Sequence, residues 1–145
     1  MPKTLEASLM AEGKGSILWV DDEIDLLKSH ILFLEEKGYE VIPVSNGEDA
    51  VRIVATKPPN IMLLDQMMPG LDGWQVCKRV RAFSNVPIVI LSALDDAAMI
   101  ASALDAGADD YLVKPVSSSI LVAHLNRLIR RTGTLDAPNG VAIRP

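Results

Sequence analysis

The feature that most constrains the fold is a regular alternation of short apolar runs with amphipathic stretches. Five runs of aliphatic or β-branched residues follow one another along the chain: Ile17–Val20, Val41–Val44, Ile61–Leu64, Val86–Leu91 and Tyr111–Val113. Most of them are apolar at consecutive positions, which is typical of strands buried on both faces of a parallel sheet. The alternation therefore predicts an α/β domain.

Each apolar run is followed by a stretch with the spacing of an amphipathic helix. The first has apolar residues from Ile24 to Leu34 and stops at Gly38, a residue type favoured just after helix ends. The other helices are predicted over about Glu48–Thr56, after Asp72-Gly73, over Asp96–Ala106 and over Ser118–Arg131. A (βα)₅ order with short connections predicts an open, doubly wound sheet, because right-handed crossovers place helices on both of its faces.

Length and charge narrow the possible functions. A chain of 145 residues with a net charge of −5 fits one domain and lacks the overall basic field of a nucleic-acid binder. No apolar run approaches the roughly 20 residues that span a membrane, and the single cysteine, Cys77, is compatible with a reducing compartment. We expect a cytoplasmic protein without nucleic-acid or membrane contact. Residues 16–131 form the predicted domain, with an N-terminal tail at 1–15 and a linker stub or tail at 132–145.

Chemically active side chains follow four of the predicted strands. They are Asp21 and Asp22 after the first, Asp65 after the third, Ser92 after the fourth and Lys114 after the fifth. In an open α/β sheet the functional crevice lies beyond the carboxyl ends of the strands, so these groups are expected to converge. Clustered carboxylates need a counter-charge, and Mg²⁺, which takes oxygen ligands, supplies one. Carboxylate, Mg²⁺, ammonium and hydroxyl together suit a phosphoryl group.

The nucleophile at such a site is predicted to be a carboxylate. No Ser/His/Asp set is evident, since neither His30 nor His124 lies at a strand end, and no glycine-rich phosphate loop is present. Carboxylates can act as nucleophiles by forming an aspartyl phosphate. Asp65 is the best placed of them.

The same residues carry a resemblance to a known family. The motifs are Asp21-Asp22, the run Asp65-Gln-Met-Met-Pro-Gly-Leu-Asp-Gly73, Ser92-Ala93, and Tyr111-Leu-Val-Lys114-Pro115. In this order, each at a predicted strand end, they resemble the receiver domain of two-component response regulators over about residues 16–131. The resemblance implies a flavodoxin-like five-stranded sheet with strand order 2-1-3-4-5.

The resemblance also implies a role for each acidic residue. Asp65 would accept a phosphoryl group from a phosphohistidine on a sensor histidine kinase or a phosphotransfer protein. Asp22, Asp65 and the backbone carbonyl of Met67 would ligate Mg²⁺ directly, and Asp21 would act mainly through water or by positioning. The domain would promote its own phosphorylation and dephosphorylation and would otherwise be a signalling protein, not an enzyme.

Three further residues would carry the response to phosphorylation. Lys114 would pair with Asp65 and then with the phosphoryl oxygens, and Ser92 would bond the phosphoryl group and draw its loop inward. Tyr111 would turn from exposed to buried. The Lys114-Pro115 bond would be cis, a form that is cheap only before proline. The face made by the fourth helix, fifth strand and fifth helix would then change.

The C-terminal part is similar to receivers that precede a winged-helix DNA-binding domain (the OmpR/PhoB-like subfamily), as its Ala106–Tyr111 stretch and Arg130-Arg131 ending indicate. In that subfamily a basic residue on the fourth helix and an acidic one on the fifth pair across a dimer. This chain has Ile100 and Ile120 there, and His124 where a further basic residue is usual. Helical spacing places Ile120, His124, Arg127 and Arg131 on one face. The hypothesis is a homodimer whose contact is partly apolar.

Two other functions remain open from the residues. A Mg²⁺-dependent phosphatase of the haloacid-dehalogenase type would use Asp65 on small substrates, but it needs an acid two residues later, where this chain has Met67. A receiver-like module could instead bind partners without being phosphorylated. The intact set of Asp22, Asp65, Ser92 and Lys114 argues against that reading.

Overall fold

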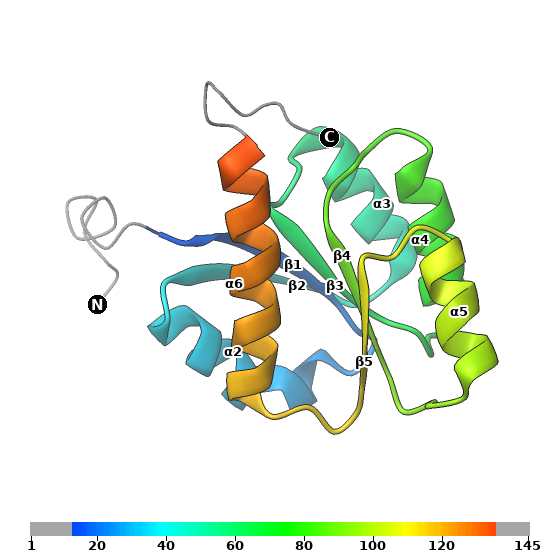
Figure 1. Cartoon of the computed structure of the whole chain (residues 1–145), viewed down its shortest axis with the longest axis horizontal. Helices are drawn as coiled ribbons and strands as arrows, with labels where there is room; N and C mark the ends of the chain where they lie inside the picture. The colour runs from blue at the N-terminus through cyan, green and yellow to red at the C-terminus, as the bar shows by residue number, and fades with distance from the viewer. Residues whose placement is uncertain (1–12, 136–145) are drawn as a thin grey trace.

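The computed structural model describes residues 13–135, which form one parallel sheet with helices on both faces (Figure 1). The sheet has the order β2-β1-β3-β4-β5, and every neighbouring pair is parallel. Its strands are β1 (Gly15–Val20), β2 (Tyr39–Val44), β3 (Ile61–Asp65), β4 (Ile88–Ser92) and β5 (Asp110–Val113). The predicted α/β class and strand order are confirmed.

Two helical layers cover the sheet (Figure 1). One layer holds α2 (Lys28–Glu36), which follows the short 3-10 turn η1 (Ile24–Leu27), and α6 (Ser118–Leu135). The other holds α3 (Gly47–Thr56), α4 (Gly73–Arg81) and α5 (Ala97–Asp105). Among the described residues, none of the helices combines the length and the apolar character needed to cross a membrane.

The apolar runs are explained by burial on both sides of the sheet. Along β1, Leu18 and Val20 join the core under α3, α4 and α5, whereas Ile17 and Trp19 join the core under α2 and α6. Successive side chains of a strand point to opposite faces, so a strand covered on both sides has no polar face. Full burial of one such side chain stabilises the fold by about 1.5–3 kcal/mol.

Some predicted boundaries were wrong. The strand β4 begins at Ile88, not at Val86, because Pro87 has no N–H to give and the Val86 N–H bonds the Ser84 hydroxyl. The helix α6 continues to Leu135, past its predicted end at Arg131, and β1 begins at Gly15, before its predicted start at Ile17. The remainder of the predicted tails, residues 1–12 and 136–145, lies outside the described residues.

Candidate functional site

The chemically active residues meet at the carboxyl edge of the sheet. Asp21 follows β1, Asp65 is the last residue of β3, Ser92 is the last of β4 and Lys114 follows β5. Parallel strands end at the same edge, and the pairing of Asp65 with Leu91 sets Ser92 one residue past the acid on the neighbouring strand. These strand ends converge in the structure, as the sequence predicted.

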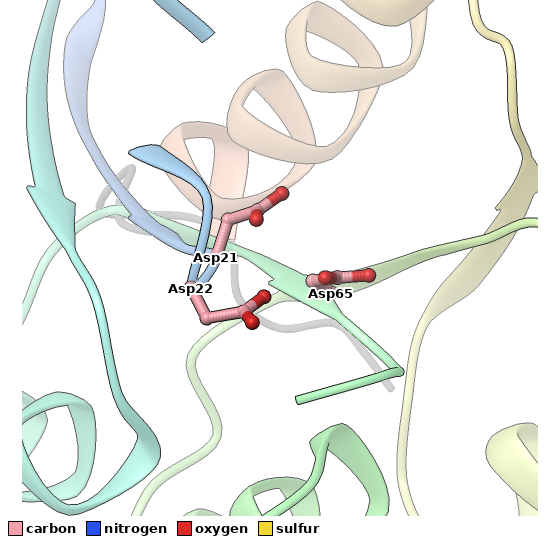
Figure 2. A group of neighbouring side chains, drawn as sticks. All are labelled: Asp21, Asp22 and Asp65. Atoms are coloured by element: carbon pink, nitrogen blue, oxygen red, sulfur yellow. The ribbon is translucent and has the colours of Figure 1, made fainter. Parts of the chain in front are cut away.

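Three carboxylates form the centre of this edge (Figure 2). Asp21, Asp22 and Asp65 each offer an oxygen, and these oxygens lie within 4.8 Å of one another. Asp21 and Asp65 are buried, whereas Asp22 is exposed. Oxygen ligands from one or two carboxylates, with room for water on an open side, are what Mg²⁺ takes. The donor set therefore fits a hard divalent cation.

The Lys114 ammonium supplies a positive charge beside these carboxylates. Its Nζ lies 3.2 Å from Asp65 Oδ1 and 3.8 Å from Asp21 Oδ2. The Lys114–Pro115 peptide bond is cis, as the resemblance implied. One ammonium against three carboxylates leaves the cluster with excess negative charge.

The pKa of Asp65 reflects that imbalance. Burial raises the pKa of this carboxyl above its ordinary value, Lys114 opposes the rise and Asp21 adds to it. The backbone N–H of Met67 also favours the ionised form. A second positive charge beside Asp65 would restore the carboxylate as a nucleophile, because opposite charge favours ionisation.

Asp21 is held in place by the backbone. Its Oδ1 accepts a hydrogen bond from the Glu23 N–H at 2.8 Å. A short acidic side chain bonding the N–H two residues on is a common turn in Asp-rich strand ends, so the sequence Asp21-Asp22-Glu23 carried a signal for it.

Ser92 and Tyr111 are joined through one residue that the sequence analysis missed. The Ser92 hydroxyl is buried and accepts a hydrogen bond from the Leu94 N–H at 3.1 Å. The hydroxyl of Tyr111, a half-buried residue, donates to the Leu94 carbonyl at 2.8 Å. The loop between β4 and α5 is therefore tied to both residues.

The predicted interface residues lie on α5 and α6, with different surroundings. Ile120 is 53% exposed, Ile100 is half-buried and Arg131 is exposed. His124, in contrast, bonds within the chain, with its Nδ1 2.5 Å from Asp110 Oδ2. Asp110 is the residue that the sequence analysis overlooked here, since it lies in a different element from His124.

An acidic, lysine-containing site at the point where strand order reverses defines a class of doubly wound α/β domain, and comparisons with known proteins identify the family. A family model described as "Response regulator receiver domain" matches residues 17–126. The chain therefore belongs to the response regulator receiver family and is a receiver domain of a two-component response regulator.

Individual curated relatives are consistent with this family. The chain is 45% identical over 123 residues to the "Probable transcriptional regulator ycf27" of Cyanophora paradoxa, covering 85% of this chain and 52% of that protein. It is 38% identical over 130 residues to the "Transcriptional regulatory protein CseB" of Streptomyces avermitilis, covering 90% of this chain and 55% of that protein. The chain thus spans about half the length of these relatives.

Two solved structures of receiver domains have the same fold. The receiver domain of the Francisella response regulator 1452 superposes with a TM-score of 0.77 at 34% sequence identity, covering 81% of this chain and 98% of that chain. The BeF3-activated receiver domain of Klebsiella pneumoniae RstA has a TM-score of 0.75 at 30% identity, covering 79% of this chain and 98% of that chain.

Proposed function

We propose that Asp65 is the phosphoacceptor of this domain. The observation that carries the proposal is the contact of Asp65 with Lys114, at 3.2 Å, inside a cluster of three carboxylates. An Asp65 oxygen would attack the phosphorus of a phosphohistidine, forming a P–O bond as the P–N bond breaks. The leaving imidazole takes a proton from solvent, and the product is an acyl phosphate on Asp65.

Asp22, Asp65 and the Met67 carbonyl would hold Mg²⁺ in this site, with Asp21 acting through water. The ion supplies positive charge for the phosphoryl oxygens when it is bound. Asp21, fixed by the Glu23 N–H, keeps the buried side of the cluster negative, so that a cation is retained at this edge. Lys114 neutralises part of the charge without leaving the site.

The switch would begin at Lys114 and Ser92. A phosphoryl group adds roughly −1.5 to −2 charge and three acceptor oxygens, which attract the Lys114 ammonium and the Ser92 hydroxyl proton. The Ser92 oxygen already bonds Leu94, and Leu94 bonds Tyr111, so an inward movement of this loop displaces Tyr111 as well. The face made by α5, β5 and α6 changes as a result.

The partners follow from that chemistry. The phosphodonor would be a sensor histidine kinase or a phosphotransfer protein, and the compartment that we propose is the cytoplasm. Because the relatives named above are transcriptional regulators of about twice the matched length, we propose that this receiver serves a regulator of transcription. The receiver itself would not contact nucleic acid or a membrane. Its intrinsic activity would be limited to its own phosphorylation and dephosphorylation.

The phosphoacceptor is tested with a small phosphodonor. Incubation with acetyl phosphate and Mg²⁺ should add the mass of one phosphoryl group to the intact chain, in an acid-stable and base-labile bond. Asp65→Asn should abolish the adduct, while Asp105→Asn, at an exposed acid on α5, should leave it unchanged. A full adduct on the Asp65→Asn variant would refute the assignment. Phosphate release in large molar excess would instead support a phosphatase, and no adduct at all would support a binding module.

The proposed dimer is tested at Ile120. Ile100 and Ile120 stand where a charge pair is usual in the subfamily, and Ile120 is 53% exposed. The dimer contact through α5, β5 and α6 would therefore be partly apolar. Ile120→Glu should weaken self-association of the phosphorylated protein, as measured by sedimentation velocity, and Ile120→Leu should preserve it. An unchanged dimer affinity in Ile120→Glu would remove this part of the proposal.

A further inference from the structure

An apolar cavity of about 460 Å³ lies on the α2 and α6 side of the sheet, next to the acidic site. Its apolar lining comes from η1, β4, the segment after β5, and α6: Leu26, Leu27, Leu91, Pro115, Val116 and Leu121. Small-molecule sites in proteins have this size and are lined mainly by apolar side chains, with a few polar groups that fix orientation. The volume and lining alone fit such a site.

Two residues that line the cavity each carry a buried polar atom without a hydrogen-bond partner among the described residues. Trp19 lines the cavity and is only 2% exposed, and its indole Nε1 has no hydrogen-bond partner among the described residues. The Nδ1 of His30, which also lines the cavity, is buried and equally without a partner there. The two rings meet edge to face, with centroids 6.1 Å apart. Buried polar groups are nearly always paired, so these two indicate a partner from outside the chain.

The hydrogen-bonding chemistry of Trp19 restricts that partner. An indole nitrogen donates a hydrogen bond and accepts none, so the ligand must bring an acceptor oxygen or nitrogen. The ring nitrogen of His30 can serve as donor or acceptor, depending on its tautomer. A carbonyl or hydroxyl group on an apolar body meets these requirements.

Charge at the rim restricts the partner further. Asp21 and Glu23 face the cavity together with a single ammonium, that of Lys114. Lys114 is already engaged with Asp65 and Asp21, at 3.2 and 3.8 Å. An anionic ligand would meet two carboxylates, and a cationic one would be drawn to the acidic cluster instead. A neutral molecule avoids both costs.

We propose that this cavity binds a small neutral molecule with an apolar body, whose carbonyl or hydroxyl oxygen accepts a hydrogen bond from Trp19 Nε1. The site goes beyond the phosphoacceptor function, because neither Trp19 nor His30 takes part in that chemistry. It shares only the Lys114 and Asp21 wall with the acidic cluster. Binding can therefore be measured on metal-free, unphosphorylated protein.

Benzamide is a suitable probe, because it combines one aromatic ring with a neutral carbonyl. In ¹H–¹⁵N spectra of the ¹⁵N-labelled full chain, titration should move the indole N–H peak of Trp19 downfield in a saturable way. Trp74, on α4 at the opposite layer, provides an internal control whose indole peak should stay in place. Benzoate, which has the same ring with a negative charge, should bind at least tenfold more weakly.

Two variants complete the test. Trp19→Phe removes the donor and should weaken benzamide binding by at least tenfold, as followed by the backbone peaks of Val116 and Leu121. If Trp19→Phe does not fold, Val116→Phe, which adds bulk to a half-buried wall residue, should have the same effect. A static Trp19 peak would mean that water satisfies the indole, and would overturn the proposal. Equal movement of the Trp74 peak, or benzoate binding as tightly as benzamide, would overturn it as well.

Discussion

The amino and carboxyl edges of the sheet, where the parallel strands begin and end, each hold a charged cluster, and the two clusters differ in charge balance. At the amino edge, Arg81 donates from Nε to the Gly107 carbonyl at 2.9 Å and from a terminal nitrogen to the Val86 carbonyl at 2.7 Å. Its other terminal nitrogen lies 2.8 Å from Asp109, which also accepts the Ile88 N–H at 2.8 Å. One cation and one carboxylate thus tie α4 to the starts of β4 and β5.

At the carboxyl edge, three carboxylates share one ammonium. Burial leaves the ionised form of Asp65 disfavoured, as its raised pKa shows. The amino edge is balanced and holds the fold together, whereas the carboxyl edge has excess negative charge, which fits the cation and the phosphoryl group that we propose for it. Charge balance, and not the mere presence of acidic residues, distinguishes the two.

Backbone geometry reinforces the difference. Gly107 has φ +113°, and a Cβ there would lie 2.6 Å from Cγ of Arg81. The residue is therefore glycine for two reasons, its left-handed backbone and the close approach of the arginine. The amino edge is packed around its ion pair, which is typical of a structural role.

The largest predicted effect is at the amino edge. Asp109→Ala leaves one terminal nitrogen of Arg81 and the Ile88 N–H without the carboxylate that accepts from both, so the free energy of unfolding should fall by about 2–3 kcal/mol. Urea denaturation measures the change, and Asp105→Ala, at an exposed acid on α5, is the matched control. A loss below 0.5 kcal/mol, which is about the scatter of surface substitutions, would show that the amino edge is not structural.

The second prediction concerns Mg²⁺ at the carboxyl edge. In the proposed site the cation would bind only the folded carboxylate cluster, so Mg²⁺ at tenfold over its Kd should stabilise the protein by about 1.4 kcal/mol. Thermal unfolding with and without Mg²⁺ gives the shift, and chelation by EDTA should reverse it. Sodium chloride at equal ionic strength controls for general screening. Equal stabilisation by sodium chloride would mean that this edge has no specific cation site.

Sequence analysis could predict the carboxyl edge because its geometry follows from strand direction alone. Asp21, Asp65 and Lys114 each follow a recognisable strand, and parallel strands bring their ends together. The amino edge could not be predicted in the same way. Arg81 and Asp109 are 28 residues apart on different elements, and their pairing depends on how α4 packs beside β5. The Asp110 contact with His124 was missed for the same reason.

The helix α6 shows a second limit of prediction from the sequence. Its apolar stripe, from Leu121 to Leu128, was recognisable from helical spacing, and these residues are buried under the sheet. Its end at Leu135 was not, because residues 132–135 (Thr-Gly-Thr-Leu) carry no apolar periodicity in the sequence to mark it. Apolar periodicity marks the face of a helix that packs on a core, and it does not by itself mark the residue at which the helix ends.

The third prediction tests an uncharged member of the amino edge. Tyr39 begins β2 and its hydroxyl donates to Oδ1 of Asn126 on α6. Tyr39→Phe removes this bond and should cost about 1 kcal/mol at neutral pH. Chemical denaturation of both proteins measures the difference, and Tyr111→Phe, which loses a bond near the carboxyl edge instead, is the comparison.

The stabilising contribution of Tyr39 should also depend on pH. Burial raises the pKa of the Tyr39 phenol above its ordinary value, against a smaller lowering effect of Arg130. The folded state therefore binds this proton more tightly than the unfolded chain, whose tyrosines titrate near pH 10. The contribution of Tyr39 is intact below about pH 10 and is lost as pH rises through the folded-state pKa. The stability gap between wild type and Tyr39→Phe should narrow in that range, and a constant gap would contradict the sign.

The smallest predicted change in stability, and the sharpest contrast with Asp109, is at Asp22. This carboxylate is exposed, and no ion pair to it is found in the described part of the chain. Lys114, the cation of the cluster, pairs with Asp65 and Asp21 instead. In metal-free buffer Asp22→Ala should therefore change the free energy of unfolding by no more than about 0.5 kcal/mol. Its effect should appear only when Mg²⁺ is added, because the variant lacks one of the ligands that we propose and should need at least tenfold more cation for the same stabilisation. A substitution at Asp22 as costly as the one at Asp109, in the absence of metal, would mean that both edges are structural and that charge balance does not separate them.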